Sequence, residues 1–182
     1  MKTISQLPDE EVIQLVRTTD KEAYAEIIKR YQMKLLRYAS YLVHDEQAGA
    51  DVVQNGFIKS YINLNGFNTK KKFSSWLYRI VHNEAMNVLG KSKNQRPINE
   101  HDHFESDIDI EDEVIKKELV THAHSCLEEM SVLYKEPLSL YYLEDKSYNE
   151  ISDILRIPIG TVAIRMNRAK GIMKHICQKH KK

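Results

Sequence analysis

The sequence predicts an all-α protein built from two small helical domains. Along nearly every long segment, apolar residues recur at intervals of three and four, which is the period of an amphipathic helix. No segment combines alternating β-branched residues with hairpin turns, so we expect no sheet. A polar segment at residues 92–109, which contains Pro97, separates the helical parts. We therefore expect domains at residues 1–91 and 110–182, joined by a flexible acidic linker at 92–109.

The first domain is expected to contain helices at residues 9–18, 21–42, 47–63 and 73–91. Asp20 stands immediately before the second of these, where its carboxylate can accept a hydrogen bond from a first-turn amide. Asn65, Gly66 and Asn68 favour turns and mark the connection between the third and fourth helices.

The second domain is expected to contain helices at residues 110–130, 132–143, 148–156 and 160–178. Ser147 and Glu150 have the spacing of a capping box at the start of the third of these. A short interruption with Pro158 and Gly160 then separates the last two helices, and Thr161 is expected to cap the final one. Two short helices joined by a tight turn are typical of a DNA-binding helix-turn-helix.

The final helix has one apolar and one basic face. Val162, Met166, Ala169, Met173 and Ile176 recur at alternating steps of four and three and predict the buried face. The residues left outside include Arg165, Arg168, Lys170 and Lys174. A basic outer face suits the phosphates and base edges of duplex DNA, although an ordinary amphipathic surface helix has the same pattern.

The formal net charge of +1 hides a strong asymmetry along the chain. From Arg156 to Lys182 there are basic residues and not one Asp or Glu, which indicates a polyanionic partner. Between Glu100 and Glu113 there are acidic residues and no Lys or Arg, so we expect that run to stay solvated and extended.

Several classes of function find no support in the sequence. It contains no nucleophile paired with a base, no metal-ligand cluster and no phosphate-binding glycine loop, so we expect no enzyme, catalytic residue, cofactor or metal. Cys126 and Cys177 are expected to be buried free thiols rather than a redox or zinc site. Without a long apolar stretch or a signal peptide, the chain is expected to be cytoplasmic, with no stable membrane insertion.

A second candidate for nucleic-acid binding lies at residues 70–83. Lys70, Lys71 and Lys72 precede a helix that carries Trp76 and Asn83. Lysines attract a nucleic-acid backbone, rings stack on bases, and an amide can hydrogen-bond a base exposed by unstacking. The alternative is that the apolar residues of this helix only form its core face, which we expect of Leu77 and Ile80.

Three segments of the chain, in this order, match motifs of one protein family. Residues 51–61 resemble D-[LV]-V-Q-E-x-F-[IL]-[KR]-[AS]-[YW], residues 73–83 resemble F-x-[ST]-W-L-Y-R-I-A-x-N, and residues 160–169 resemble G-T-V-x-S-R-x-x-R-A. The chain thus resembles bacterial RNA polymerase sigma factors of the extracytoplasmic function group, in the sigma-70 family. The resemblance implies a promoter-specificity subunit that binds core RNA polymerase and promotes transcription initiation.

The same resemblance implies roles for particular residues. Asp51, Val53 and Gln54 would bind core polymerase, and the linker would run toward the polymerase active centre. Promoter DNA would be bound as a melted single strand at the minus-ten element and as duplex at the minus-thirty-five element, and an anti-sigma factor would be a further partner. The implied minus-ten residues are Lys70, Lys71, Lys72, Trp76 and Asn83, and the implied minus-thirty-five residues are Thr161, Arg165, Arg168, Lys170 and Lys174.

The chain departs from the family pattern at a few positions. Asn55 replaces the usual glutamate, and Gly56 follows it inside a helix, where glycine costs up to about 1 kcal/mol relative to alanine. Ala163 and Ile164 stand where relatives often have polar or basic residues, so the preferred promoter sequence does not transfer. Two alternatives remain open: a helix-turn-helix transcriptional regulator that uses only the C-terminal domain, and a sigma-like decoy that binds an anti-sigma factor.

Overall fold

The computed structural model describes residues 3–93, 123 and 125–180. The acidic run, the predicted linker beyond Lys93 and most of the helix predicted at 110–130 lie outside these residues. All regular structure in the described part is helical, which confirms the predicted fold class of two helical domains.

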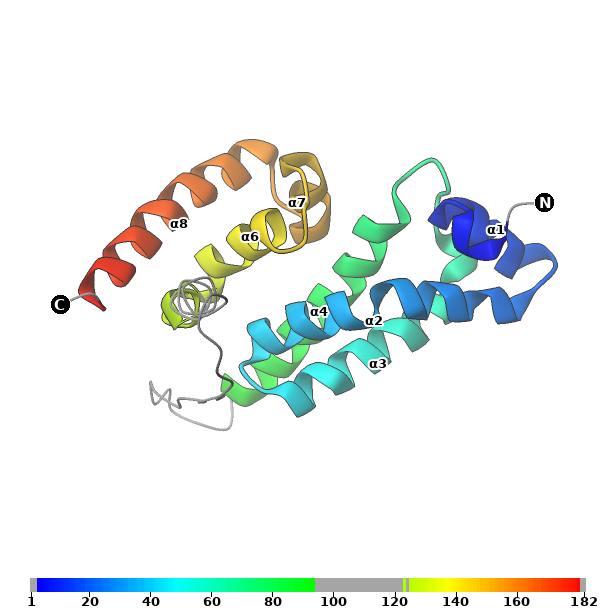
Figure 1. The fold of residues 1–182 in the computed structure, drawn as a ribbon, viewed down its shortest axis with the longest axis horizontal. Coiled ribbons are helices and arrows are strands. Elements are labelled where there is room, and N and C mark those ends of the chain that lie inside the picture. Colours follow the sequence, from blue (N-terminus) through cyan, green and yellow to red (C-terminus); the bar gives the residue numbers. More distant parts are fainter. Residues whose placement is uncertain (1–2, 94–122, 124, 181–182) are drawn as a thin grey trace, which may run out of the picture.

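Among the described residues, four long helices form the N-terminal domain, and three form the C-terminal domain after a helical turn at residues 125–128. In Figure 1, α2, α3 and α4 run side by side, and α6 and α7 lie against α2 and α4. The helices are α1 (Asp9–Thr18), α2 (Tyr24–Val43), α3 (Glu46–Ile62), α4 (Phe73–Lys93), α6 (Val132–Tyr142), α7 (Tyr148–Leu155) and α8 (Ile159–Lys179). Short 3-10 helices occur at Ile4–Gln6, Lys21–Ala23 and Leu64–Gly66.

The expected caps are confirmed at two helices and wrong at a third. Asp20 accepts a hydrogen bond from the Glu22 amide at 2.9 Å, and Ser147 forms the capping box of α7 with Glu150. Thr161, however, does not cap α8, because α8 already begins at Ile159 after Pro158. The fixed φ of proline suits the position before a helix, and the Thr161 amide donates to the Pro158 carbonyl at 2.8 Å within the first turn.

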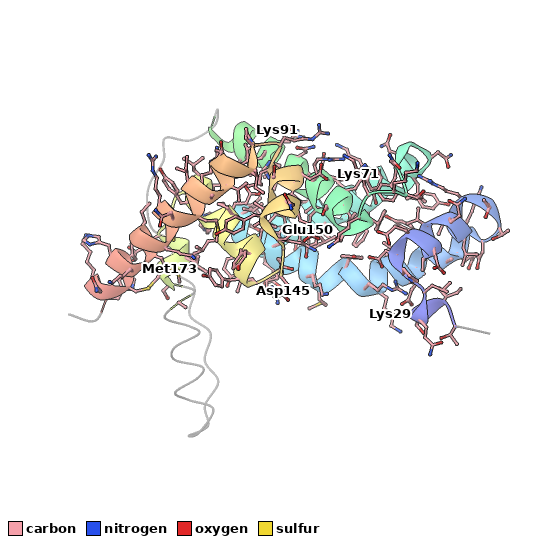
Figure 2. The ribbon with its side chains drawn as sticks, turned by 90° about the horizontal axis from the view of Figure 1, so that it is seen from above. Lys29, Lys71, Lys91, Asp145, Glu150 and Met173 are labelled. Carbon is pink, nitrogen blue, oxygen red and sulfur yellow. A yellow bond between two sulfur atoms is a disulfide. The ribbon has the colours of Figure 1, made fainter. Side chains whose placement is uncertain are left out.

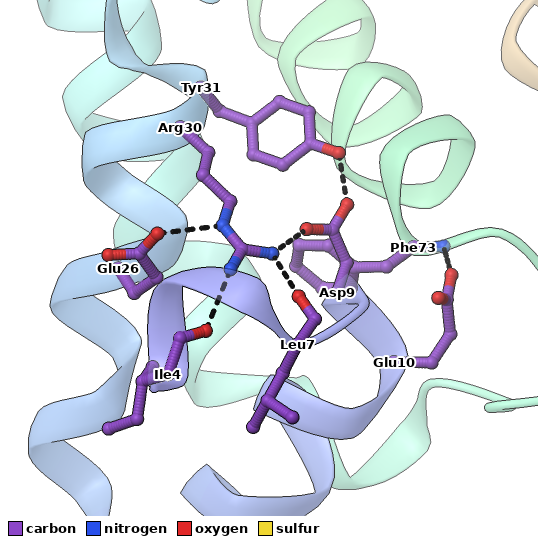
Figure 3. A network of polar contacts seen from close by, with 8 residues as sticks. All are labelled: Ile4, Leu7, Asp9, Glu10, Glu26, Arg30, Tyr31 and Phe73. Atoms are coloured by element: carbon purple, nitrogen blue, oxygen red, sulfur yellow. Dashed lines mark hydrogen bonds and ion pairs between the residues drawn. The ribbon is translucent and has the colours of Figure 1, made fainter. Parts of the chain in front are cut away.

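A polar network around Arg30 joins α1 to α2 (Figure 3). The guanidinium of Arg30 contacts the carboxylates of Asp9 and Glu26 at 2.8 and 2.9 Å, and Tyr31 also donates to Asp9. The next residue of α1, Glu10, accepts a hydrogen bond from the Phe73 amide at 2.8 Å. Through this contact α1 holds the first turn of α4, which directly follows the basic segment at residues 70–72.

Two glycines of α3 permit the close packing of the first domain. A Cβ atom at Gly56 would lie 2.7 Å from Cγ2 of Val81 on α4, so the unusual glycine has a packing reason. At Gly49 a Cβ atom would lie 2.9 Å from both the Cα and the amide nitrogen of Ser40 on α2. At Gly49 the backbone of α2 leaves no room for a larger residue, whereas at Gly56 the obstacle is the Val81 side chain, which would have to move.

The two domains meet at buried carboxylates, the first of which belongs to Glu136 of α6. Its side chain is 6% exposed and accepts a hydrogen bond from the Tyr38 hydroxyl at 2.6 Å. His82 of α4 places Nδ1 at 2.6 Å from the same oxygen. Beside this group, Lys135 is completely buried, and its ammonium group lies 2.9 Å from Nε2 of His44.

The second carboxylate belongs to Glu144, in the connection between α6 and α7. Its side chain is 2% exposed, and one oxygen lies 2.6 Å from the guanidinium of Arg37 on α2. The other oxygen accepts a hydrogen bond from Tyr78 of α4 at 2.5 Å. We refer to the packing of α6 and α7 against α2 and α4 through Glu136 and Glu144 as the closed arrangement.

The prediction of free thiols is wrong, because Cys126 and Cys177 form a disulfide. The bond ties the last turns of α8 to the helical turn at residues 125–128, and His180 contacts Glu129 beside it. The two cysteines are 51 positions apart and lack any recognisable spacing motif, so the sequence alone did not indicate that they would meet.

We predict that Gly49→Ala destabilises the protein, because α2 must move to accommodate the new methyl group. Overpacking of this kind costs about 1–3 kcal/mol. The free energy of unfolding can be measured by urea denaturation. Gly90→Ala on α4 is the control, since nothing lies within 4 Å of its Cβ position, and it should be neutral or stabilising by up to about 1 kcal/mol. Equal effects of the two changes would contradict the packing account.

We predict that Lys135→Met raises the stability of the protein at neutral pH. Burial lowers the pKa of Lys135 from 10.5 to about 8, so the folded chain carries an unfavourable buried charge below pH 8. Between about pH 8 and 10.5 the unfolded chain binds the extra proton, and wild-type stability rises with pH through this contribution.

At pH 7 we expect a Tm increase of about 2–4 °C for Lys135→Met, which corresponds to about 1 kcal/mol. The difference from wild type should narrow as the pH rises from 8 to 10. Lys29→Met, on an exposed part of α2, is the control and should leave Tm unchanged. A lower Tm for Lys135→Met at pH 7 would show that the ammonium group stabilises the closed arrangement instead.

Candidate nucleic-acid interface

The basic segment lies on the connection between α3 and α4, with its lysines exposed. Arg17 of α1 fixes the start of this connection by donating hydrogen bonds to the carbonyls of Leu64 and Phe67. The side chain of Asn68 then accepts from the Lys70 amide at 3.0 Å, which forms the turn that the sequence predicted. Lys70, Lys71 and Lys72 therefore project from a connection whose backbone is held on both sides.

Trp76 and Asn83 share one face of α4, because they are seven positions apart in a helix. Trp76 is half-buried, and its ring packs at centroid distances of 5.2 Å from Phe67 and 5.6 Å from Phe73. Asn83 is exposed. Leu77 is completely buried, which confirms its predicted role in the core, whereas Ile80 is only half-buried. The face thus offers an anchored ring and an accessible amide.

The first helix of the helix-turn-helix places two acidic side chains against this basic surface. Lys72 Nζ lies 3.1 Å from a carboxylate oxygen of Glu150, and Arg79 lies 3.1 Å from Asp153. Lys71 lies 4.0 Å from the same Asp153 oxygen. Figure 2 labels Lys71 and Glu150, which belong to segments far apart in the sequence. The sequence did not predict these contacts, because charge patterns within each helix carry no information about the facing domain.

The pKa of Glu150 is lowered despite partial burial, which by itself would raise it. Hydrogen bonds from the Ser147 hydroxyl and amide, together with the Lys72 ammonium group, outweigh burial. Glu150 is therefore a stable anion at neutral pH, and it serves both as the capping residue of α7 and as a partner of Lys72.

Three of the five residues predicted on the buried face of α8 are buried, whereas Met173 and Ile176 are only half-buried. Val162, Met166 and Ala169 are completely buried, while Arg168, Lys170 and Lys174 are exposed and Arg165 and Thr161 are half-buried. At about 100° per residue, Arg168 and Lys174 are about 120° apart around the helix axis. The predicted residues therefore form two flanks, one with Thr161, Arg165 and Arg168 and the other with Lys170 and Lys174.

The second flank of α8 borders a shallow apolar hollow. Its lining comes from Leu138 and Tyr142 of α6 and from Lys170, Met173 and Lys174 of α8. Lys170 Nζ lies 5.9 Å from the centroid of the Tyr142 ring. These two lysines thus combine a positive charge with an aromatic and apolar surface.

Of the three residues expected on the polymerase-binding surface, two are exposed and one is not. Asp51 and Gln54 are exposed on α3. Val53 is only 5% exposed and packs in the core, so its placement on the surface was wrong. The helical period explains the difference, because Val53 shares the inward face with Phe57. The exposed face continues instead through Ile58 and Ile62, which are 50% and 71% exposed and were not predicted.

Two family models match the chain, one in each domain. Residues 27–95 match Sigma-70 region 2, and residues 123–173 match Sigma-70, region 4. The chain is 31% identical to the RNA polymerase sigma-H factor of Pseudomonas aeruginosa, over 92% of both chains. It is 32% identical to the ECF RNA polymerase sigma-E factor of Haemophilus influenzae, over 95% of this chain and 97% of that one.

The chain belongs to the extracytoplasmic function group of the sigma-70 family. It is a sigma factor, the promoter-specificity subunit of RNA polymerase, and acts in transcription initiation. Members of this family are not enzymes. The match to region 2 accounts for the segment at residues 70–83, which a regulator with only a helix-turn-helix would leave unexplained.

Solved structures share the fold of this sigma factor. CnrH, solved in complex with the cytosolic domain of CnrY, has a TM-score of 0.71 and 19% identity over 94% of this chain and 97% of that one. The sigma factor RpoE from Bartonella quintana, solved with the anti-sigma factor NepR, has a TM-score of 0.66 and 18% identity over 85% and 96%. Within the described residues, none of the helices has the length and apolarity needed to cross a membrane.

Proposed function

We propose that this sigma factor reads its promoter with two separate surfaces, one in each domain. The observation that supports the proposal most directly is the exposed Asn83 on the same face of α4 as the anchored Trp76 ring, just after three exposed lysines. Lys70, Lys71 and Lys72 would attract the phosphates of the melted minus-ten strand. The Trp76 ring would stack on a base or wedge beside it, and Asn83 would hydrogen-bond a base edge.

The second surface would bind the minus-thirty-five element as duplex. Thr161, Arg165 and Arg168 form one flank of α8 and would approach base edges and phosphates in the major groove. Lys170 and Lys174 on the other flank would contact phosphates, which position a protein without reading sequence. Since the exposed Ala163 and Ile164 offer only apolar contacts, base discrimination would depend chiefly on the arginines.

The core polymerase would bind the exposed face of α3. Asp51 and Gln54 lie in line with Ile58 and Ile62 at helical spacing, so a polar and an apolar part adjoin on one continuous stripe. Exposed apolar residues at helical intervals are typical of a surface that a partner covers. Val53 would support this stripe from within the core.

The remaining assignments follow from the family. The domains would extend over residues 1–91 and 110–182, with the segment at 92–109 leading toward the polymerase active centre. An anti-sigma factor would regulate the chain by covering its polymerase or promoter surfaces. The protein would act in the cytoplasm, where it would need no cofactor, because it positions and melts DNA without covalent chemistry.

We predict that Asn83→Ala slows open-complex formation and leaves duplex binding intact. The loss of one hydrogen bond to an unstacked base should lower the rate about fivefold to tenfold. The measurement is in vitro transcription and permanganate footprinting with core polymerase on promoters selected from a genomic library. Gln14→Ala, an exposed amide on α1, is the matched control and should have no effect. Unchanged opening in Asn83→Ala, or no promoter-dependent initiation by the wild type, would contradict the proposal.

We predict that Arg168→Ala weakens binding to the duplex upstream element. The logarithm of the binding constant falls as the logarithm of the salt concentration rises. With one fewer phosphate contact, this negative slope should become shallower by about 0.9. Filter binding or fluorescence anisotropy of the holoenzyme on the selected promoters, between low and moderate salt, gives this slope. Lys29→Ala removes a positive charge from an exposed site on α2 and should leave the slope unchanged. Equal slopes for wild type and Arg168→Ala would exclude Arg168 from the interface.

A further inference from the structure

The proposed minus-ten surface is partly neutralised within the chain itself. Its cations are Lys71, Lys72 and the neighbouring Arg79, and their anionic partners are Glu150 and Asp153 of α7. The two acidic residues are three positions apart, so they lie on the same face of α7 and point at the same part of α4. α7 also precedes α8 in the helix-turn-helix, so one short helix connects the two promoter-reading surfaces.

Carboxylates and phosphates compete for the same N–H donors. Lysine and arginine bind either anion through charge-assisted hydrogen bonds of similar length. A carboxylate close to these cations therefore both occupies donors and lowers the positive potential that would attract a nucleic-acid backbone. Arg79 is the most strongly engaged of the three, because its side chain is only 14% exposed.

We propose that Glu150 and Asp153 of α7 act as an internal competitor of promoter DNA for the basic surface of α4. The inference rests on the proposed minus-ten role of Lys71 and Lys72. In the closed arrangement, the two carboxylates neutralise these cations. Single-stranded DNA binds well only after α7 has moved away from α4.

The contacts that hold α7 in place suit a reversible closure. Glu136 and Glu144 are satisfied by side chains of the other domain, namely Tyr38, His82, Arg37 and Tyr78. On opening, these groups exchange protein partners for water. A buried charge pair contributes little net stability relative to its separated, hydrated members. Buried apolar residues of α6 and α7, however, belong to the same core as those of the first domain, so opening also exposes apolar surface. The closed arrangement is therefore specific in geometry, and it is released only by a partner whose binding free energy offsets this exposure.

The test compares DNA binding by the full-length wild-type chain and the variant Glu150→Gln/Asp153→Asn. Glutamine can keep the capping box of α7 while it removes the charge, and asparagine has the shape of aspartate. The probe is a fluorescein-labelled single-stranded DNA of ten nucleotides with mixed sequence. We expect the Kd of the variant to fall about threefold to tenfold, because each released surface pair frees a cation for phosphate.

A control is needed because the variant also gains two units of positive charge. Glu22→Gln/Glu46→Gln makes the same change at exposed positions of the first domain, and its Kd should change less than about twofold. Equal Kd changes in the two double variants would overturn the inference. Thermal melting verifies folding. Arg37→Gln is the alternative if Glu150→Gln/Asp153→Asn does not fold. It removes the α2 partner of Glu144, and its Kd for the single-stranded DNA can be compared with that of the wild type.

Lys71→Ala/Lys72→Ala separates failure of the inference from failure of the proposed function. These changes should weaken binding by the wild type and reduce the gain of Glu150→Gln/Asp153→Asn to the part that comes from Arg79. If they weaken wild-type binding but the acidic variant shows no gain over its control, the internal competition is refuted and the minus-ten surface stands. If they leave binding unchanged in every background, the minus-ten surface is misplaced and the inference falls with it.

Discussion

The closed arrangement depends on the requirement that buried carboxylates have partners. Glu136 and Glu144 are almost inaccessible to solvent, and an unpaired charge there would be very costly. Their partners come from α2 and α4, so the carboxylates are satisfied only when α6 and α7 lie in one position on the first domain. The apolar residues of the two domains share one core, and within it these directional polar contacts select one orientation.

The placement of α7 follows from these contacts and links architecture to function. Because Glu144 immediately precedes α7, its fixation brings Glu150 and Asp153 to the basic surface of α4. From the other side, α1 holds the same surface through Arg17 and Glu10. The cations proposed to bind melted DNA are thus positioned by one element and neutralised by another. In a sigma factor, this makes the relative position of the domains a determinant of DNA affinity.

The sequence predicted the helices well and the contacts between distant segments poorly. Apolar periodicity, with the Ser147 capping box at α7, places α1, α3 and α7 within a residue or two, because these signals are local. Motif resemblance indicated the family, and it also placed Val53 on the surface, where the helical period alone would have put it inside. Neither the disulfide nor the pairing of α7 with α4 was predictable, since both join residues that no sequence spacing relates.

The central claim is that Glu136 and Glu144 hold the two domains of the free chain in one position. It can be tested by the distance between spin labels at the exposed residues Gln14 of α1 and Gln178 of α8, introduced through noncanonical amino acids so that the disulfide stays intact. We predict one narrow distance distribution for the wild-type chain and a broader one for Arg37→Gln, which removes the α2 partner of Glu144. The same narrow distribution in the wild type and in Arg37→Gln would contradict the account.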